Sequence, residues 1–179
     1  DTGVTNPTLG IWLFLASEIM LFGSLFSAYA LIRSGAEQWP DQSAVLSVPL
    51  GAFNTALLVL SSFTFGRARA AVGSRKYLGA TILLGVLFLG IKAFEWNDKL
   101  AHGLVPATNN FLGLYFTMTA VHAAHLAAGI LVNAYLWGPG LRMHRHEPAR
   151  YAGRVAVARL YWNFVDVVWI ALFVVLYLL

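Results

Sequence analysis

The sequence predicts an all-α integral membrane protein whose single domain, residues 1–179, is a bundle of five transmembrane helices. Hydrophobic residues make up 59% of the chain and charged residues only 11%, whereas soluble domains average roughly 45–50% and about 25%. The mean hydropathy is +0.68. Five stretches also have the length of about 20 mostly apolar residues that a membrane-spanning helix needs. These observations exclude an ordinary soluble domain.

The five predicted spans are residues 9–32, 45–65, 77–96, 111–137 and 160–179. The first has no basic segment before it and is too long for a signal-peptide core, so we expect it to be retained. The connectors are rich in polar residues, glycine and proline, which is typical of loops. In order they are SGAEQWPDQ, GRARAAVGSRK, NDKLAHGLVPATNN and GPGLRMHRHEPARYAGR. None is long enough to form a soluble domain.

Lysine and arginine are distributed unequally between the two sides of the predicted bundle. Nine lie in or beside the second and fourth connectors, namely Arg67, Arg69, Arg75, Lys76, Arg142, Arg145, Arg150, Arg154 and Arg159, whereas only Arg33, Lys92 and Lys99 lie toward the other side. Short cytoplasmic loops of membrane proteins carry the excess of basic residues. We therefore expect a cytoplasmic N-terminus and a C-terminus on the periplasmic, or outer, side.

Several classes of function are excluded by what the sequence lacks. It contains no cysteine, which removes disulfides, thiolate zinc sites and iron–sulfur clusters. It has no nucleophile elbow, phosphate-binding loop or dinucleotide fingerprint. The basic clusters flank apolar spans, so they favour membrane topology over nucleic-acid binding. We expect no catalytic site of the chain's own.

Two histidines, His122 and His125, lie three residues apart in the fourth predicted span. Both project from one helix face, so they cannot approach a single haem iron from opposite sides. A copper or zinc ion could bind both if Glu18 or Asp166 from a neighbouring span supplied a third ligand. The alternative, which we favour, is a pair of imidazoles that pack and hydrogen-bond at a helix contact rich in alanine and glycine.

Glu18 lies nine residues into the first predicted span, roughly 14 Å deep at about 1.5 Å per residue. An acid at that depth costs at least about 2.5–3.5 kcal/mol on insertion scales. We therefore expect it to face protein or a water-filled cavity, protonated or strongly hydrogen-bonded. A proton-handling or gating role and a structural role that fixes helix register are both consistent with this position.

Three further charged side chains lie within the predicted spans. Asp166 shares a helix stripe with Arg159 and Asn163, so a local anchor is the simplest interpretation. Lys92 and Glu95 are three residues apart and are expected to neutralise each other. The functional alternative for these residues is part of an ion pathway.

Several motifs resemble, in the same order, those of the haem–copper oxidase subunit III family in its short five-helix form. They are GIWLFLASEIMLFGSLFSAY, FNTALLVLSSFT, IKAFEW, FLGLYFTMTAVHAAHLAAGI and YWNFVDVVWIALFVVLYL. The resemblance covers nearly the whole chain. Its most specific parts are the His-x-x-His block and the block that begins at Tyr161.

The resemblance implies that Glu18 is the family's membrane-buried glutamate, that His122 and His125 are its paired histidines and that Asp166 is the acid of its final motif. In that family none of these residues binds the redox metals. Haem and copper are therefore expected in partner subunits, and this chain is expected to bind neither. Asn163 stands where the final motif usually has histidine, and the first two spans of the family's seven-helix members have no counterpart here.

The function that the resemblance implies is that of a non-catalytic partner in the respiratory chain. Such a subunit docks on the catalytic subunit I of a bacterial cytochrome c oxidase, together with other oxidase subunits, holds structural phospholipids and supports proton uptake during oxygen reduction. The expected location is the bacterial cytoplasmic (inner) membrane, where the complex could join a larger respiratory supercomplex. A related five-helix accessory protein of nitric oxide reductases is the alternative, followed by a small proton channel or transporter.

Overall fold

The computed structural model describes residues 6–70 and 75–179, and within these residues the chain is helical with no strand. The helices are α1 (Asn6–Ser34), α2 (Gln42–Val45), α3 (Val48–Ala70), α4 (Arg75–Ala101), α5 (Asn110–Trp137), α6 (Leu141–His146), α7 (Pro148–Phe173) and the terminal π-helix η1 (Val174–Leu178). In the described part, five helices are long and apolar enough to cross a membrane. The all-α class and the prediction of five helices able to span a membrane are thereby confirmed.

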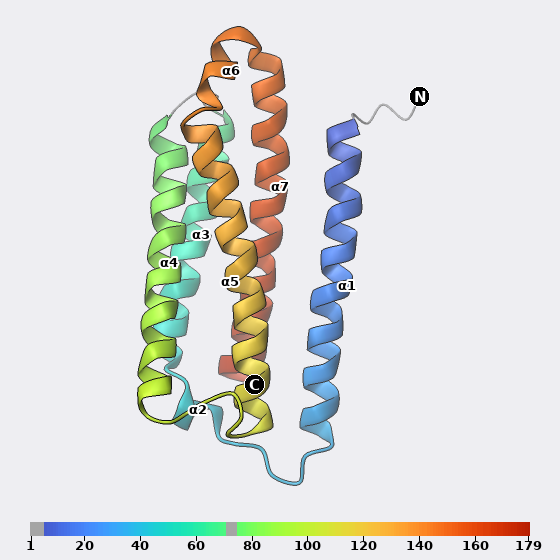
Figure 1. Cartoon of the computed structure of the whole chain (residues 1–179), viewed down its shortest axis with the longest axis vertical. Helices are drawn as coiled ribbons and strands as arrows, with labels where there is room; N and C mark the ends of the chain where they lie inside the picture. The colour runs from blue at the N-terminus through green and yellow to red at the C-terminus, as the bar shows by residue number, and fades with distance from the viewer. Residues whose placement is uncertain (1–5, 71–74) are drawn as a thin grey trace.

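Helices α3, α4, α5 and α7 form a compact bundle, and α1 stands at its side (Figure 1). α1 contacts the bundle through α7 and α5. Its buried side chains include Leu15, Phe22 and Tyr29, each about two turns from the next on one face. That face packs on the bundle, whereas most of the remaining apolar surface of α1 is exposed and suits lipid or another membrane protein.

The last span begins much earlier than predicted, at Pro148 rather than at residue 160. Its first turns are polar and basic, which made them look like a loop, but proline is well suited to the first turn of a helix. The preceding segment is helical too. His144 and His146, expected in a loop, lie on the short helix α6.

The third span also continues past its predicted end, from Trp96 to Ala101. Charged residues in this last part had indicated a loop. In the structure Lys99 is buried and its Nζ donates a hydrogen bond to the carbonyl of Val45, at 2.6 Å. Because this charge has a partner inside the protein, the helix can extend past the apolar stretch.

Trp162 lies in the middle of the bundle and is fully buried. A Cβ atom built on Gly85 of α4 would lie 2.9 Å from its ring, and one built on Gly129 of α5 would lie 3.1 Å away. Small residues at such positions let membrane helices approach closely. The indole Nε1 also donates to Ser61 of α3, at 2.9 Å, so one side chain of α7 joins all three neighbouring helices.

The two basic segments lie at the same end of the bundle, where α3 ends, α4 begins and α6 caps the turn into α7 (Figure 1). The beginning of α1 is at this end as well. Part of the first basic segment, residues 71–74, is outside the described residues. The side of the membrane on which this end of the bundle lies stays a prediction from the distribution of charge.

Candidate functional site

Glu18 and His125 meet where α1 crosses α5. The Oε2 atom of Glu18 lies 2.7 Å from Nε2 of His125, and the side chains are only 14% and 17% exposed. The ring of Phe22 packs edge-on against the imidazole, and the hydroxyl of Tyr161 donates to the carbonyl of His125, at 2.9 Å. This contact therefore joins α1, α5 and α7.

The second ring nitrogen of His125 determines how the first can bond. Nδ1 lies 2.8 Å from the carbonyl oxygen of Val121, and a carbonyl only accepts, so Nδ1 carries a proton. Nε2 then either accepts a hydrogen bond from a protonated Glu18 or donates one as part of an imidazolium. In both states one proton lies between Glu18 and His125.

His122 faces a different part of the bundle. It is 1% exposed, and its ring centroid lies 5.8 Å from that of Phe88 and 5.1 Å from that of Trp169. Neither ring nitrogen has a hydrogen-bond partner among the described residues. The two histidines of the motif therefore do not act as one unit: one packs among aromatic rings and the other bonds to α1.

Lys92 and Glu95 form the ion pair that their spacing predicts, at 2.9 Å, with 2% and 4% of the side chains exposed. Lys92 Nζ also donates to the hydroxyls of Tyr115 and Tyr177, and both hydroxyls donate to Glu95 Oε1. The ammonium lies 4.9–5.2 Å from the ring centroids of Tyr115, Trp169 and Tyr177. A buried pair with this many partners is well suited to hold α4, α5, α7 and η1 together.

Asp166 is 5% exposed and accepts a hydrogen bond from the hydroxyl of Ser62 on α3. Its other oxygen has no partner among the described residues. The sequence had indicated an anchor with Arg159, but no ion pair joins the two. Arg159 instead lies against Gly66 of α3, so Asp166 and Arg159 contact α3 separately.

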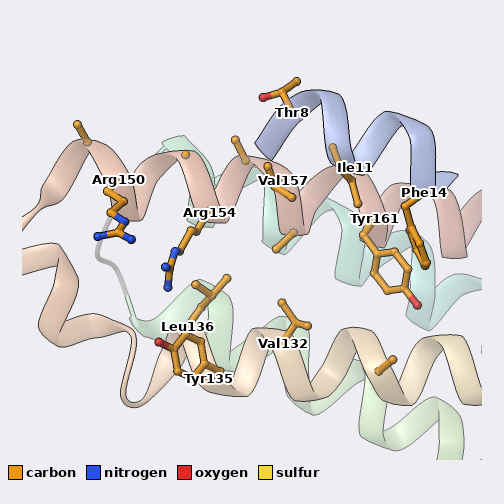
Figure 2. A pocket seen from close by; sticks show the side chains of 15 residues that line it. Thr8, Ile11, Phe14, Val132, Tyr135, Leu136, Arg150, Arg154, Val157 and Tyr161 are labelled. Atoms are coloured by element: carbon orange, nitrogen blue, oxygen red, sulfur yellow. The ribbon is translucent and has the colours of Figure 1, made fainter. Parts of the chain in front are cut away.

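A groove of about 860 Å³ separates the first turns of α1 from α5 and α7. Figure 2 shows Arg150 and Arg154 toward one end of the groove and Phe14 and Tyr161 toward the other. Between them the lining is mainly apolar and includes Val132. The groove therefore combines a basic end with an apolar interior.

A model of the family described as cytochrome c oxidase subunit III matches residues 3–179. The chain belongs to this family. Cytochrome c oxidase subunit 3 of Thermostichus vulcanus is 37% identical over 177 residues, which cover 96% of this chain and 86% of the relative. Cytochrome bo(3) ubiquinol oxidase subunit 3 of Pseudomonas aeruginosa is 33% identical over 184 residues, with 97% and 85% covered.

A third relative joins two subunits in one chain. The haem–copper oxidase subunit I+III of Aeropyrum pernix is 31% identical over 185 residues, which cover 94% of this chain but only 22% of the relative. The similarity is thus confined to a part of that protein about as long as the present chain.

The structure divides the six candidate residues of this subunit III family member into separate groups. Glu18 pairs with His125, and Lys92 pairs with Glu95. Trp169 connects the second pair to His122, because its ring contacts both the imidazole and the ammonium. Asp166 lies apart at the α3–α7 contact.

The partners Ser62, Tyr115, Tyr161 and Tyr177 were missed from sequence. Each lies in a predicted span, but its partner comes from another helix. Tyrosines inside apolar spans are a signal that could have identified three of them, because a buried hydroxyl usually finds a hydrogen-bond partner.

Within residues 6–70 and 75–179, no three histidine, aspartate or glutamate side chains gather closely enough to hold a metal ion. His125 has one carboxylate neighbour, Glu18, and His122 has aromatic neighbours. The arrangement of these residues fits hydrogen bonding and packing better than the coordination of haem iron or copper.

Proposed function

We propose that this chain is the non-catalytic subunit III of a bacterial respiratory cytochrome c oxidase, where it stabilises the haem–copper catalytic subunit and supports proton uptake during oxygen reduction. The observation that carries the proposal is the family match over residues 3–179. The relative named as subunit I+III supports it, because its name joins the two subunits in one protein.

The contribution that we assign to Glu18 and His125 is mechanical. Their hydrogen bond fastens the middle of α1 to the bundle, while Tyr29 donates to the carbonyl of Val175 and Arg33 to that of Leu179 near the other end of α1. With α1 fixed at these points, the subunit offers a constant surface to its partner.

We also propose that the groove beside α1 holds a structural phospholipid. Arg150 and Arg154 would bind the phosphate, because a guanidinium can donate two parallel hydrogen bonds to phosphate oxygens. The apolar lining would contact the acyl chains. The side chains toward the deeper end, Phe14 and Tyr161, are aromatic. The lipid would fill space that the helices of this chain leave open.

The proposed location is the bacterial inner membrane, with the basic end of the bundle in the cytoplasm. There the chain would contact subunit I, other oxidase subunits and membrane lipids, and the assembly could enter a larger respiratory supercomplex. The named relatives include both cytochrome c and ubiquinol oxidases. Oxygen consumption by the purified complex with reduced cytochrome c or with ubiquinol would identify the electron donor.

The proposal is tested by purifying the tagged chain from its native membrane in mild detergent. We expect a haem-containing, copper-containing membrane subunit to co-purify in a fixed ratio, and the preparation to reduce oxygen. A chain that purifies alone, or with a partner that reduces nitric oxide but not oxygen, would contradict it.

A further inference from the structure

One face of α7, continued by the first residue of η1, carries a regular row of side chains that are exposed or half-buried among the described residues. The row consists of Ala156, Leu160, Asn163, Val167, Ile170 and Val174, at alternating spacings of four and three residues. Val167 is 64%, Ile170 42% and Val174 39% exposed. This alternation is the repeat along which two helices pack over their whole length.

The neighbouring helices lie on either side of this row. On one side of α7, the indoles of Trp162 and Trp169 donate hydrogen bonds to side chains of α3. On another side, Tyr161 and Phe164 contact rings of α1. The row points away from both contacts, so a further helix could pack along α7 between α1 and α3.

Asn163 is the one strongly polar member of the row. It is exposed and has no hydrogen bond to the described residues. Apolar lipid chains cannot hydrogen-bond its amide, whereas polar side chains on adjacent membrane helices commonly do so. A single asparagine in such a row also fixes the register of the two helices. Asn163 therefore favours a helix with a hydrogen-bonding side chain at the same depth.

Arg159 adds a charge one turn before Asn163, about 6 Å along the axis at 1.5 Å per residue. Its guanidinium lies against Gly66, at the α3 edge of the row. Its Nε is buried and unpaired, and no ion pair with a described acid forms. A half-buried cation inside a span is complemented by an acidic group on the partner.

We propose that this face of α7 docks a transmembrane helix of the catalytic subunit, which places a hydrogen-bonding side chain opposite Asn163 and an acid opposite Arg159. The inference rests on the proposed function, and it adds the contact surface. A second copy of the chain fits less well, because a parallel two-fold contact along the row would bring the two Arg159 side chains to the same depth. Lipid chains would leave Asn163 unpaired.

Photo-crosslinking in native membranes tests the surface directly. The photoreactive residue p-benzoylphenylalanine is introduced at Val167 or, as a matched control, at Leu131 of α5, which is 71% exposed. After irradiation the tagged chain is purified and its adducts are identified by mass spectrometry. We expect an adduct with the catalytic subunit from position 167 and none from position 131.

A polar-to-apolar pair of variants provides a second readout. Asn163→Leu should lower the co-purified catalytic subunit roughly threefold to tenfold, the range expected for losing one hydrogen bond between membrane helices. Thr117→Leu removes an exposed hydroxyl of α5 that bonds only its own helix, to Gly113, and should leave the yield unchanged. Equal thermal unfolding midpoints of the two purified variants would show that both chains fold.

The failures are distinguishable. If the catalytic subunit co-purifies with the unmodified chain but position 167 crosslinks only to lipid, to a second copy or to another subunit, the α7 surface is wrong and the proposed function stands. An adduct with the catalytic subunit from position 131 and not from position 167 would likewise show that the α7 surface is wrong. If the catalytic subunit never co-purifies, both proposals are overturned.

Discussion

Glu18 and His125, 107 residues apart in the sequence, hold one proton between them across the contact of α1 and α5. The separation of Oε2 and Nε2 is 2.7 Å, within hydrogen-bonding range, and Val121 fixes the imidazole from its other side. Either the neutral pair or the ion pair satisfies both groups. The contact can therefore fasten α1 without exchanging a proton.

Replacing Glu18 separates the structural role from a proton-exchanging one. In Glu18→Gln the side-chain amide can still donate to Nε2 of His125, so we expect normal assembly and near-native oxygen reduction. Glu18→Ala leaves Nε2 without its partner, and retention of the subunit should weaken by about 1–3 kcal/mol. Subunit content and turnover are measured on the same preparations, with Ser17→Ala as a control, because Ser17 bonds only its own helix.

The contrary result for Glu18 is specific. A fully assembled Glu18→Gln complex that loses activity, or inactivates faster over repeated turnovers, would make proton exchange at Glu18 the better account.

The contributions of Lys92 and Glu95 to the stability of the protein should be strongly coupled. Lys92→Met leaves the Glu95 carboxylate buried without a cation, which typically costs about 3–5 kcal/mol, whereas Lys92→Met combined with Glu95→Gln removes both charges and should recover most of that loss. The measurement is the thermal unfolding midpoint in detergent. Glu147→Gln breaks an exposed pair with Arg150 and should change stability by less than about 1 kcal/mol. A double variant no more stable than Lys92→Met would refute this coupling.

Close packing around Trp162 predicts a different response at two glycines of α4. Gly85→Ala places a methyl group 2.9 Å from the indole, and such overpacking typically costs about 1–3 kcal/mol. Gly90→Ala meets nothing within 4 Å and should stabilise the helix by about 0.5–1 kcal/mol. Equal unfolding midpoints for the two variants would be inconsistent with the described packing.

The sequence predicted the spans well because the length and hydropathy of a membrane helix are local properties. It misjudged the start of α7 and the end of α4, where polar residues resemble a loop. Pro148 begins a helix there, and Lys99 finds a partner in Val45. Local composition does not reveal such tertiary partners.

The candidate site was predicted only in part. The depth of Glu18 and the spacing of Lys92 and Glu95 can be read from the sequence. The pairing of Glu18 with His125 depends on how α1 lies against α5, and the donors Tyr115 and Tyr177 come from distant segments. Sequence reasoning had named Glu18 as a neighbour of the histidine pair only as a third metal ligand, whereas the structure shows a hydrogen bond to His125 alone.

Topology is predicted from nine basic residues against three on the two sides of the bundle. Because the chain has no cysteine, single cysteines report cleanly. An impermeant thiol reagent added to intact cells with a permeable outer membrane should label Gln38→Cys and spare His146→Cys, since both positions are exposed at opposite ends of the bundle. Labelling of position 146 and not of position 38 would show that the chain has the opposite orientation in the membrane.

The distribution of haem and copper after the complex is separated tests the account most directly. Once stronger detergent has released this chain from its co-purified partner, each fraction is examined for a Soret absorption band and for copper by elemental analysis. We predict that both stay with the partner in stoichiometric amounts and that neither accompanies this chain. A stoichiometric Soret band, or tightly bound copper, on the separated chain would contradict its role as a non-catalytic subunit.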